Sequence, residues 1–256
     1  MSALTKSGAF RALGVVPHRP TSLNSAAAPT IVKVGRFEIR SLEAEETSLV
    51  PSLEDDSVIQ MHDVASGWGN GLHPTTRLCL DFVLDAVKAG DDVLDYGTGS
   101  GILSILSLRL GARHVVSVDI DDDSLRAAAN NAVLNGFDDG RMDVVHTRHV
   151  YIGEKRFPLA DVTVANILPG PLSRLVAPLW GLSKPGALLC LSGMRPAELA
   201  AIRSIYVPFV DLSTEQVRRA THPDFGEWVA WSVRFKVMSE TEKRQARDSL
   251  TELAME

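Results

Sequence analysis

A short glycine-rich segment constrains the fold of this chain more than any other feature. Residues 93–101 read VLDYGTGSG, which predicts a buried strand that ends near the acidic Asp95 and turns through three glycines into a helix. A strand, a glycine-rich turn and a helix N-terminus in this order open the nucleotide site of doubly wound α/β folds. The alternative is an ordinary strand-to-helix turn whose glycines only allow tight packing.

The spacing of the glycines separates two classes of ligand. Gly97, Gly99 and Gly101 follow the pattern G-x-G-x-G, whereas the dinucleotide fingerprint is G-x-G-x-x-G. The pattern D-x-G-x-G-x-G resembles the first motif of the S-adenosylmethionine-dependent methyltransferases with a Rossmann-like fold. This cofactor has no pyrophosphate for the helix to neutralise, but it has a methionyl ammonium that Asp95 can attract, directly or through water.

A second acid ends the next predicted strand. Residues 114–119 (HVVSVD) are β-branched and close on Asp119. This position is near the separation of about 20 residues at which an acid meets the ribose hydroxyls in such folds. A carboxylate suits that role because it accepts hydrogen bonds from two vicinal hydroxyls. The acids at 121–123 start a further helix, and we interpret them as capping residues rather than ligands.

A glycine-rich loop precedes the first core strand. Residues 67–76 read GWGNGLHPTT, and the alternating glycines allow the backbone to approach a ligand closely. Pro74 suits the first position of a helix. We expect this loop to fold over the cofactor as a lid.

The fourth predicted core strand delivers a polar side chain to its C-terminal end. Residues 161–166 (DVTVAN) end at Asn166, and by count this strand lies beside the first, where the strand order reverses and ligands bind. The side-chain oxygen of Asn166 can accept a hydrogen bond from an attacking amine, while neighbouring carbonyls accept others. These bonds would orient the nitrogen lone pair toward a transferable methyl group.

Together these segments resemble the ribosomal protein L11 methyltransferase family. That family has the motifs G-x-G-x-H-P-T-T, V-L-D-x-G-x-G-S-G-I-L, V-D-I-D, V-A-N-I-L-x-G-P-L and K-P-G-x-L-x-L-S-G. The chain has GNGLHPTT at 69–76, VLDYGTGSGIL at 93–103, VDID at 118–121, VANILPGPL at 164–172 and KPGALLCLSG at 184–193. The resemblance covers 66–193 and weakens afterwards, and the histidine- and asparagine-containing motifs are its most specific parts.

The resemblance implies methyl transfer from S-adenosyl-L-methionine to protein amino groups, either lysine side chains or an N-terminal amine, with ribosomal protein L11 as one candidate substrate. The residues that it implies for the cofactor are Asn70, Gly71, His73, Thr75, Asp95, Gly97, Thr98, Gly99, Gly101, Asp119, Ile120 and Asn166. It implies a catalytic segment made of Asn166, Ile167 and Leu168. No metal site is expected, and the chemistry requires no dedicated general base, although His73 is a candidate.

Two departures from the family leave the substrate open. The chain has too little sequence before residue 60 for the separate N-terminal domain with which bacterial members hold their substrate protein, and Trp68 and Asn70 stand where the family usually has Phe and Thr. A small-molecule N-methyltransferase is therefore an alternative. An NAD-binding oxidoreductase fits the glycine spacing less well, and a non-catalytic scaffold does not fit the complete set of site residues.

The N-terminal leader has a distinct composition. Residues 1–37 contain no Asp or Glu but several Lys and Arg, and residues 1–30 are rich in Ser, Thr and Ala. This composition is typical of an organelle transit peptide, with a disordered extension as the equal alternative. A transit peptide would place the protein in the mitochondrion or plastid, and otherwise the cytoplasm is expected.

The expected fold is α/β: a Rossmann-like seven-stranded methyltransferase sheet, mostly parallel with an antiparallel C-terminal strand and helices on both faces. We expect a strand and loop extension at 31–65, the methyltransferase domain at 66–238, in which 207–212 and 228–237 pair, and a charged helical tail at 239–256. The net charge of −6 argues against a nucleic-acid partner. No apolar run approaches the roughly 20 residues of a membrane span. The oligomeric state stays open.

Overall fold

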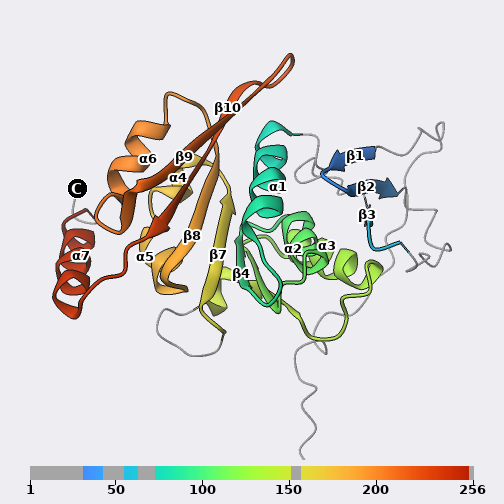
Figure 1. The fold of residues 1–256 in the computed structure, drawn as a ribbon, viewed down its shortest axis with the longest axis horizontal. Coiled ribbons are helices and arrows are strands. Elements are labelled where there is room, and N and C mark those ends of the chain that lie inside the picture. Colours follow the sequence, from blue (N-terminus) through green and yellow to red (C-terminus); the bar gives the residue numbers. More distant parts are fainter. Residues whose placement is uncertain (1–30, 43–54, 63–72, 151–156, 254–256) are drawn as a thin grey trace, which may run out of the picture.

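The computed structural model describes residues 31–42, 55–62, 73–150 and 157–253. The proposed leader, and Asn70 and Gly71 among the predicted cofactor residues, lie outside them. The described chain forms a seven-stranded and a three-stranded sheet with helices between them (Figure 1).

The large sheet has the strand order β6-β5-β4-β7-β8-β10-β9. Its strands are β4 (Asp92–Tyr96), β5 (His114–Asp119), β6 (Met142–His146), β7 (Ala160–Asn166), β8 (Ser183–Met194), β9 (Val210–His222) and β10 (Gly226–Phe235). Neighbouring strands from β6 to β8 are parallel, and β10 runs antiparallel to β8 and β9. The predicted sheet is confirmed, including the reversal of strand order between β4 and β7.

Helices cover both faces of this sheet (Figure 1). One face carries α1 (Pro74–Ala86), α2 (Ile102–Arg109) and α3 (Asp122–Leu134), and the other carries α4 (Pro169–Leu172), α5 (Val176–Gly181) and α6 (Leu199–Tyr206). Each face has its own hydrophobic core. Side chains alternate along a strand, so Val93 of β4 packs in the first core, under α1, α2 and α3, and Leu94 packs in the second, under α4, α5 and α6. The tail helix α7 (Glu240–Leu253) reaches the second core through Ala246.

The acids that precede and begin α3 lie where capping predicts them. Asp121 is the N-cap, and its carboxylate accepts a hydrogen bond from the main-chain N of Ser124 at 2.9 Å. Asp122 and Asp123 follow in the first turn, where negative charge is favourable because the helix N-terminus carries partial positive charge. The predicted capping role is confirmed for Asp121.

The small sheet consists of β1 (Ile31–Val34), β2 (Phe37–Leu42) and β3 (Val58–His62), in that order. The antiparallel β1–β2 pair turns at Gly35, which has a φ of 54°. Its buried side chains, among them Val34, Phe37 and Ile59, belong to the same core as α1, α2 and α3. The sheet is therefore packed onto the helical layer rather than forming a core of its own.

Two strands differ from the sequence-based expectation. Strand β3 is not predicted at all, because it is short and follows an acid-rich run. Strand β9 continues to His222, well beyond the predicted end at 212, and most of its side chains are exposed or half-buried. In the described sheet it is an edge strand whose neighbour is β10. Main-chain hydrogen bonds hold it there, and these do not require the alternating apolar side chains by which a strand is recognised in a sequence.

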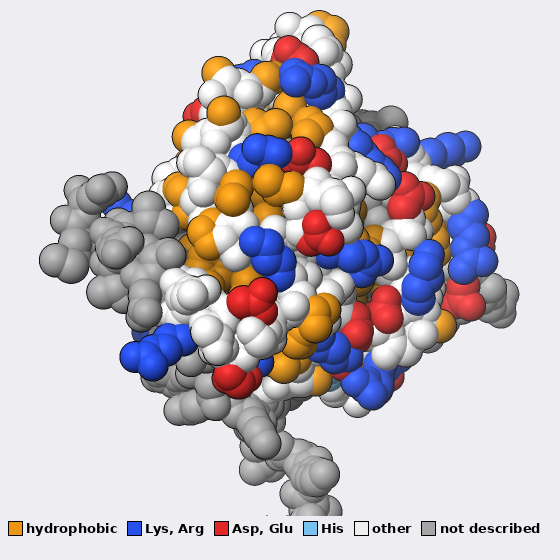
Figure 2. All heavy atoms as spheres, turned by 60° about the vertical axis from the view of Figure 1, so that its left-hand side comes forward, with side chains coloured by type: hydrophobic (Ala, Val, Ile, Leu, Met, Phe, Trp, Pro, Cys, Tyr) orange, Lys and Arg blue, Asp and Glu red, His pale blue; other side chains and the backbone are white. Residues whose placement is uncertain are grey.

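The surface turned forward in Figure 2 mixes positive and negative side chains instead of gathering one sign. Ion pairs join such charges elsewhere in the structure, as in the two 2.8 Å bonds between the Arg203 guanidinium and the Glu215 carboxylate. Within the described part of the chain, no helix is long and apolar enough to cross a membrane.

An ion cluster around the buried Asp92 holds the N-terminal ends of β4, β7 and β8 together. The side chain of Asp92 is almost fully buried, and its carboxylate accepts hydrogen bonds from Arg113, with Lys184 Nζ at 3.4 Å. Lys184 also binds the Asp161 carboxylate at 2.6 Å, which in turn accepts the main-chain N–H of Asp92 at 2.9 Å. Burial by itself raises the pKa of Asp92, but Arg113 and Lys184 outweigh it and hold the pKa below its ordinary value.

We predict that Asp92→Asn lowers the free energy of unfolding at pH 7 by about 1.5–3 kcal/mol, the usual range for hydrogen bonds to charged groups. Because the folded-state pKa is lowered, the Asp92 contribution is present above the ordinary pKa of 3.8 and is lost as the pH falls through the folded value. Urea unfolding at pH 7 and at pH 3 measures both effects. The exposed Asp123–Arg126 pair is the control, since Asp123→Asn should change stability by less than about 1 kcal/mol. An equal loss in both variants would contradict the prediction.

Candidate functional site

The site predicted from the sequence lies at the C-terminal ends of β4, β5 and β7. Short contacts join its parts: Gly99 N donates to the Asp119 carboxylate at 2.9 Å, and Thr98 Oγ1 donates to Asp95 at 2.8 Å. The side chain of Asn166 reaches Thr76 at the start of α1. The structure therefore brings together the predicted residues that it describes, although they come from four separate segments.

The glycine-rich loop is shaped by close approaches that exclude side chains. Gly97 has a φ of 84°, and a Cβ built on it would lie 2.1 Å from Cγ2 of Ile167. Gly97 N and Thr98 N both donate to the carbonyl of Val118, at 2.7 and 3.0 Å. The loop is thus fixed against the end of β5 on one side and against the segment after β7 on the other.

Asp95 lies beneath this loop and is fully buried. Its Oδ2 accepts hydrogen bonds from Thr98 Oγ1 at 2.8 Å and from Ser104 Oγ at 2.7 Å. Among the described residues, its Oδ1 has no hydrogen-bond partner. Burial raises the pKa of Asp95 to about 6, against the lowering effect of the hydrogen bonds from Ser104 and Thr98, and the charge of Asp119 adds to the rise. A buried carboxylate oxygen without a partner is costly unless a cation or water meets it.

Asp119 ends β5 and is oriented by main-chain groups. Its Oδ1 accepts from the N–H of Ile120 at 2.7 Å and of Asp121 at 3.0 Å, while Oδ2 accepts from Gly99. A carboxylate offers about four acceptor positions, so three bonds leave little more than one position for a ligand hydroxyl. The side chain of Ile120 is 74% exposed beside it, an unusual position for a large apolar group.

Asn166 ends β7 with its side-chain nitrogen toward Thr76 Oγ1, at a distance of 3.4 Å. Ile167 follows and lies between Gly97 and Gly193. Its side chain contacts Gly97, and a Cβ on Gly193 would lie 2.2 Å from the Ile167 carbonyl oxygen. The carbonyl of Leu168 accepts from Leu172 N at 3.1 Å, and the Leu168 side chain is 57% exposed. The segment is thus held against the glycine-rich loop, with Asn166 half-buried and the side chain of Leu168 exposed.

His73 is the N-cap of α1. Its Nδ1 accepts from Thr75 N at 3.3 Å and lies 2.8 Å from Thr75 Oγ1. The imidazole packs against Phe225 and Trp228, with ring centroids 5.0 and 4.7 Å away. Burial, and then the positive charges of Arg195 and His222, lower the pKa of His73. His73 is therefore a capping residue whose Nδ1 binds main chain.

The tip of the β9–β10 hairpin thereby closes one side of the site. The guanidinium of Arg195 lies 3.8 Å from the centre of the Trp228 ring and donates to the carbonyls of Phe225 and Glu227. Trp231, by contrast, is fully buried in the sheet. Trp228 thus lies beside His73, whereas Trp231 packs inside the sheet.

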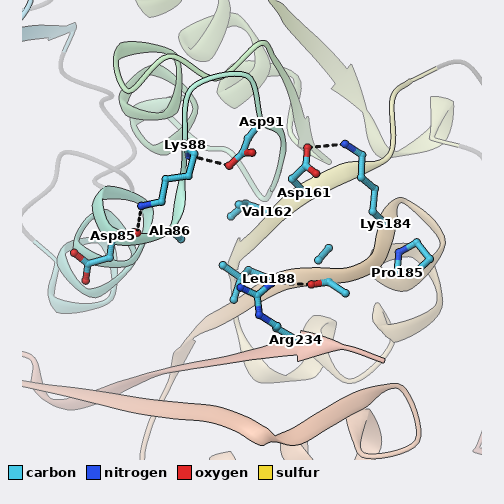
Figure 3. Close-up of a pocket in the computed structure, with 12 residues that line it drawn as sticks. Asp85, Ala86, Lys88, Asp91, Asp161, Val162, Lys184, Pro185, Leu188 and Arg234 are labelled. Atoms are coloured by element: carbon cyan, nitrogen blue, oxygen red, sulfur yellow. Dashed lines mark hydrogen bonds and ion pairs between the residues drawn. The ribbon is translucent and has the colours of Figure 1, made fainter. Parts of the chain in front are cut away.

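A separate surface hollow of about 430 Å³ lies at the opposite end of the sheet (Figure 3). Its charged groups have partners, as in the 2.6 Å bond between Lys184 and Asp161 and the 2.9 Å bond from Lys88 Nζ to the Asp85 carbonyl. None of the predicted site residues lines it. Within the described ranges, no group of three or more His, Cys, Asp or Glu side chains is arranged to hold a metal ion.

The sequence-based site omits three residues that the structure places in it. Gly193 and Thr76 lie within the motifs of the resemblance, but their contacts with Ile167 and Asn166 join segments far apart in the chain. Ser104, on α2, is fully buried and donates to Asp95. The sequence does contain a signal for Ser104. It lies three residues after Gly101, in the first turn of α2, so its side chain can face the glycine-rich loop.

Sequence comparisons agree with this geometry. The family model described as ribosomal protein L11 methyltransferase (PrmA) matches residues 34–235. A ribosomal protein L11 methyltransferase of Pseudomonas aeruginosa is 42% identical over 159 residues, which are 62% of this chain and 52% of the relative. One from Cupriavidus metallidurans is 34% identical over 216 residues, covering 82% of this chain and 68% of the relative. The chain thus spans only about half the length of the first of these relatives.

A structural comparison gives the same grouping. The crystal structure of a ribosomal protein L11 methylase from Lactobacillus delbrueckii subsp. bulgaricus has a TM-score of 0.59 and 26% sequence identity, covering 80% of this chain and 97% of that one. The family model covers most of the described chain, and it includes the glycine-rich loop, Asp119 and the Asn166 segment. The chain belongs to the ribosomal protein L11 methyltransferase family.

Proposed function

We propose that this chain is an S-adenosyl-L-methionine-dependent N-methyltransferase that acts on protein amino groups. The observation that carries the proposal is the seating of Asn166 and Leu168 directly beside the glycine-rich loop, through the contact of Ile167 with Gly97. A group that can hold an amine therefore lies next to a loop built to hold a cofactor.

The described residues fit the proposed cofactor in three places. The unpartnered Oδ1 of Asp95 offers a buried negative charge for the methionyl ammonium, directly or through water. Asp119 retains acceptor capacity for a ribose hydroxyl, and the exposed side chain of Ile120 offers an apolar surface for the base. When bound, S-adenosyl-L-methionine supplies an electrophilic methyl group on a sulfonium.

The residues after β7 would position the acceptor. The reacting nitrogen must lie about 3–3.5 Å from the methyl carbon with its lone pair aligned. Asn166 Oδ1 can accept a hydrogen bond from the amine, since its amide nitrogen is directed to Thr76. The exposed Leu168 side chain can pack on the methylene chain of a lysine. The carbonyl of Ile167 is packed against Gly193, so we assign Ile167 the role of holding the segment in place.

The amine must be uncharged before it can react. Transfer from water into the space between the loop and Leu168 disfavours its ammonium form and lowers its pKa. His73 is not needed for this step, because its Nδ1 caps α1. The names of the relatives point to ribosomal protein L11 as the first acceptor to test, with small amines as the alternative.

Thermal-shift measurements with S-adenosylmethionine, its demethylated product and NAD test the proposed class of cofactor. Stabilisation by the first two only supports the proposal. Stabilisation by NAD alone would reject it. The proposal would also be rejected if none of the three compounds raised the melting temperature and calorimetry then detected no binding of S-adenosylmethionine. Transfer of a radiolabelled methyl group to purified ribosomal protein L11, compared with small amines, then identifies the acceptor class.

We predict that Asn166→Ala and Asn166→Asp retain cofactor affinity and lose turnover by about 100-fold, the order expected when one orienting bond in the transition state is removed. The Asp variant fails for a second reason, since its negative charge favours the protonated, unreactive amine. Calorimetric titration of the cofactor and the radiolabel assay give the two quantities separately. Asn130→Ala, at an exposed position on α3, is the control. Full turnover in Asn166→Ala would remove Asn166 from the reaction.

We predict that cofactor affinity increases as the pH rises from about 4.5 to 7, a range in which an α-amino group stays protonated. The reason is that Asp95, with its pKa raised to about 6, becomes ionised and attracts the ammonium. The folding stability of the unliganded protein depends on pH in the opposite direction, so that it decreases as the pH rises. The folded state holds the proton between the ordinary pKa of 3.8 and about 6, so the Asp95 contribution to stability falls across that window, by on the order of 3 kcal/mol.

Asp95→Asn separates the two effects. It should weaken cofactor binding at pH 7, abolish most of the pH dependence of affinity, and leave the unliganded protein at least as stable at neutral pH. Calorimetric titrations and urea unfolding at several pH values measure this. A wild-type affinity that is constant between pH 4.5 and 7 would show that Asp95 does not meet the ammonium.

A further inference from the structure

Two buried asparagines, Asn131 in α3 and Asn135 at its C-cap, cover the free edge of β3. Strand β3 pairs with β2 on one side only. On its other side, Gln60 N donates to Asn135 Oδ1 at 3.0 Å, Asn135 Nδ2 donates to the Gln60 carbonyl at 2.6 Å, and His62 N donates to Asn131 Oδ1 at 2.8 Å. The amides replace a neighbouring strand, because residues four apart on a helix match alternate residues of the strand.

Asn131 has a second partner, and this partner belongs to the glycine-rich loop. Its Nδ2 donates to the Ser100 carbonyl at 2.9 Å. The Nδ2 of Asn135 instead binds the Gln60 carbonyl and the carbonyl of Asn131. Both asparagines are almost completely buried, so water cannot replace these bonds. Of these two asparagines, only Asn131 connects the small sheet to the loop.

The helix that carries Asn131 is itself held close to the loop. A Cβ on Gly101 would lie 3.1 Å from Cα of Ala128, which precedes Asn131 by about one helical turn. The Ser100 carbonyl lies between Gly99, which binds Asp119, and Gly101, which begins α2. A shift of this peptide would move Gly99 N and, with it, the Asp119 carboxylate that we propose binds the cofactor.

We propose that Asn131 is a positioning residue for the cofactor, which fixes the peptide of Ser100 and couples the three-stranded sheet to cofactor affinity. This inference rests on the proposed function, because it assigns the loop to S-adenosyl-L-methionine. Asn135 has the same burial, the same helix and the same strand but no bond to the loop. It therefore stabilises the sheet without acting on the cofactor.

The matched pair Asn131→Ala and Asn135→Ala tests this assignment in the full chain. Both variants should lose stability. Only Asn131→Ala should weaken binding of S-adenosylmethionine, by about tenfold, the equivalent of one lost buried hydrogen bond, with the KM for the acceptor unchanged. Asn131→Asp, which keeps the acceptor for His62 N but cannot donate to Ser100, should weaken cofactor binding similarly. Equal cofactor affinities in the Asn131 and Asn135 variants would overturn the proposal.

Hydrogen exchange of the wild-type protein provides a test that does not depend on the folding of a variant. Coupling between two sites is reciprocal, so addition of S-adenosylmethionine should slow exchange of the His62 amide more than that of Gln60. Protection of the loop amides without protection of His62 would contradict the coupling. Absence of any cofactor binding by the wild-type protein in calorimetry would instead refute the proposed function, which keeps the two failures distinct.

Discussion

The close approach of two backbone segments at the reversal of strand order is the constraint on which the site depends. Ile167 lies between Gly97 and Gly193, and a side chain on either glycine would occupy space that Ile167 already fills. This packing brings the segment that holds Asn166 against the loop under which Asp95 lies. The loop proposed to hold the cofactor and the residue proposed to bind the acceptor thus share one close contact, as in-line transfer would require.

The site also contains groups that are unfavourable for stability. Asp95 is buried with one oxygen unpartnered among the described residues, and the large side chains of Ile120 and Leu168 are exposed. Such features persist where the surrounding structure holds them in place. Here the support comes from Thr98 and Ser104 around Asp95, and from the buried asparagines that tie α3 to the small sheet. Ligand binding would remove these costs, because it would partner the carboxylate and cover the apolar groups.

The central part of the chain and the strands on either side of it were predictable to different degrees. The core from β4 to β8 has β-branched strands, glycine turns and capped helices, and each local signal agrees with the final fold. Strand β3 and the second half of β9 carry weak signals, because β3 is edged by side-chain amides and β9 lies at the edge of the large sheet. Similarly, Asp119 was predictable as the acid at the end of a strand, but its bond to Gly99 was not.

The sequence by itself determined the order of the strands, the position of the glycine-rich loop and the identity of the polar residues at the strand ends. These follow from periodicity and local chain geometry, which act over a few residues. The tertiary structure alone decided that Ile167 fits between Gly97 and Gly193, that His73 packs beside Trp228, and that Asn131 bridges His62 and Ser100. Those contacts join residues that are distant in the chain, and close packing, which has no signature in local sequence, selects them.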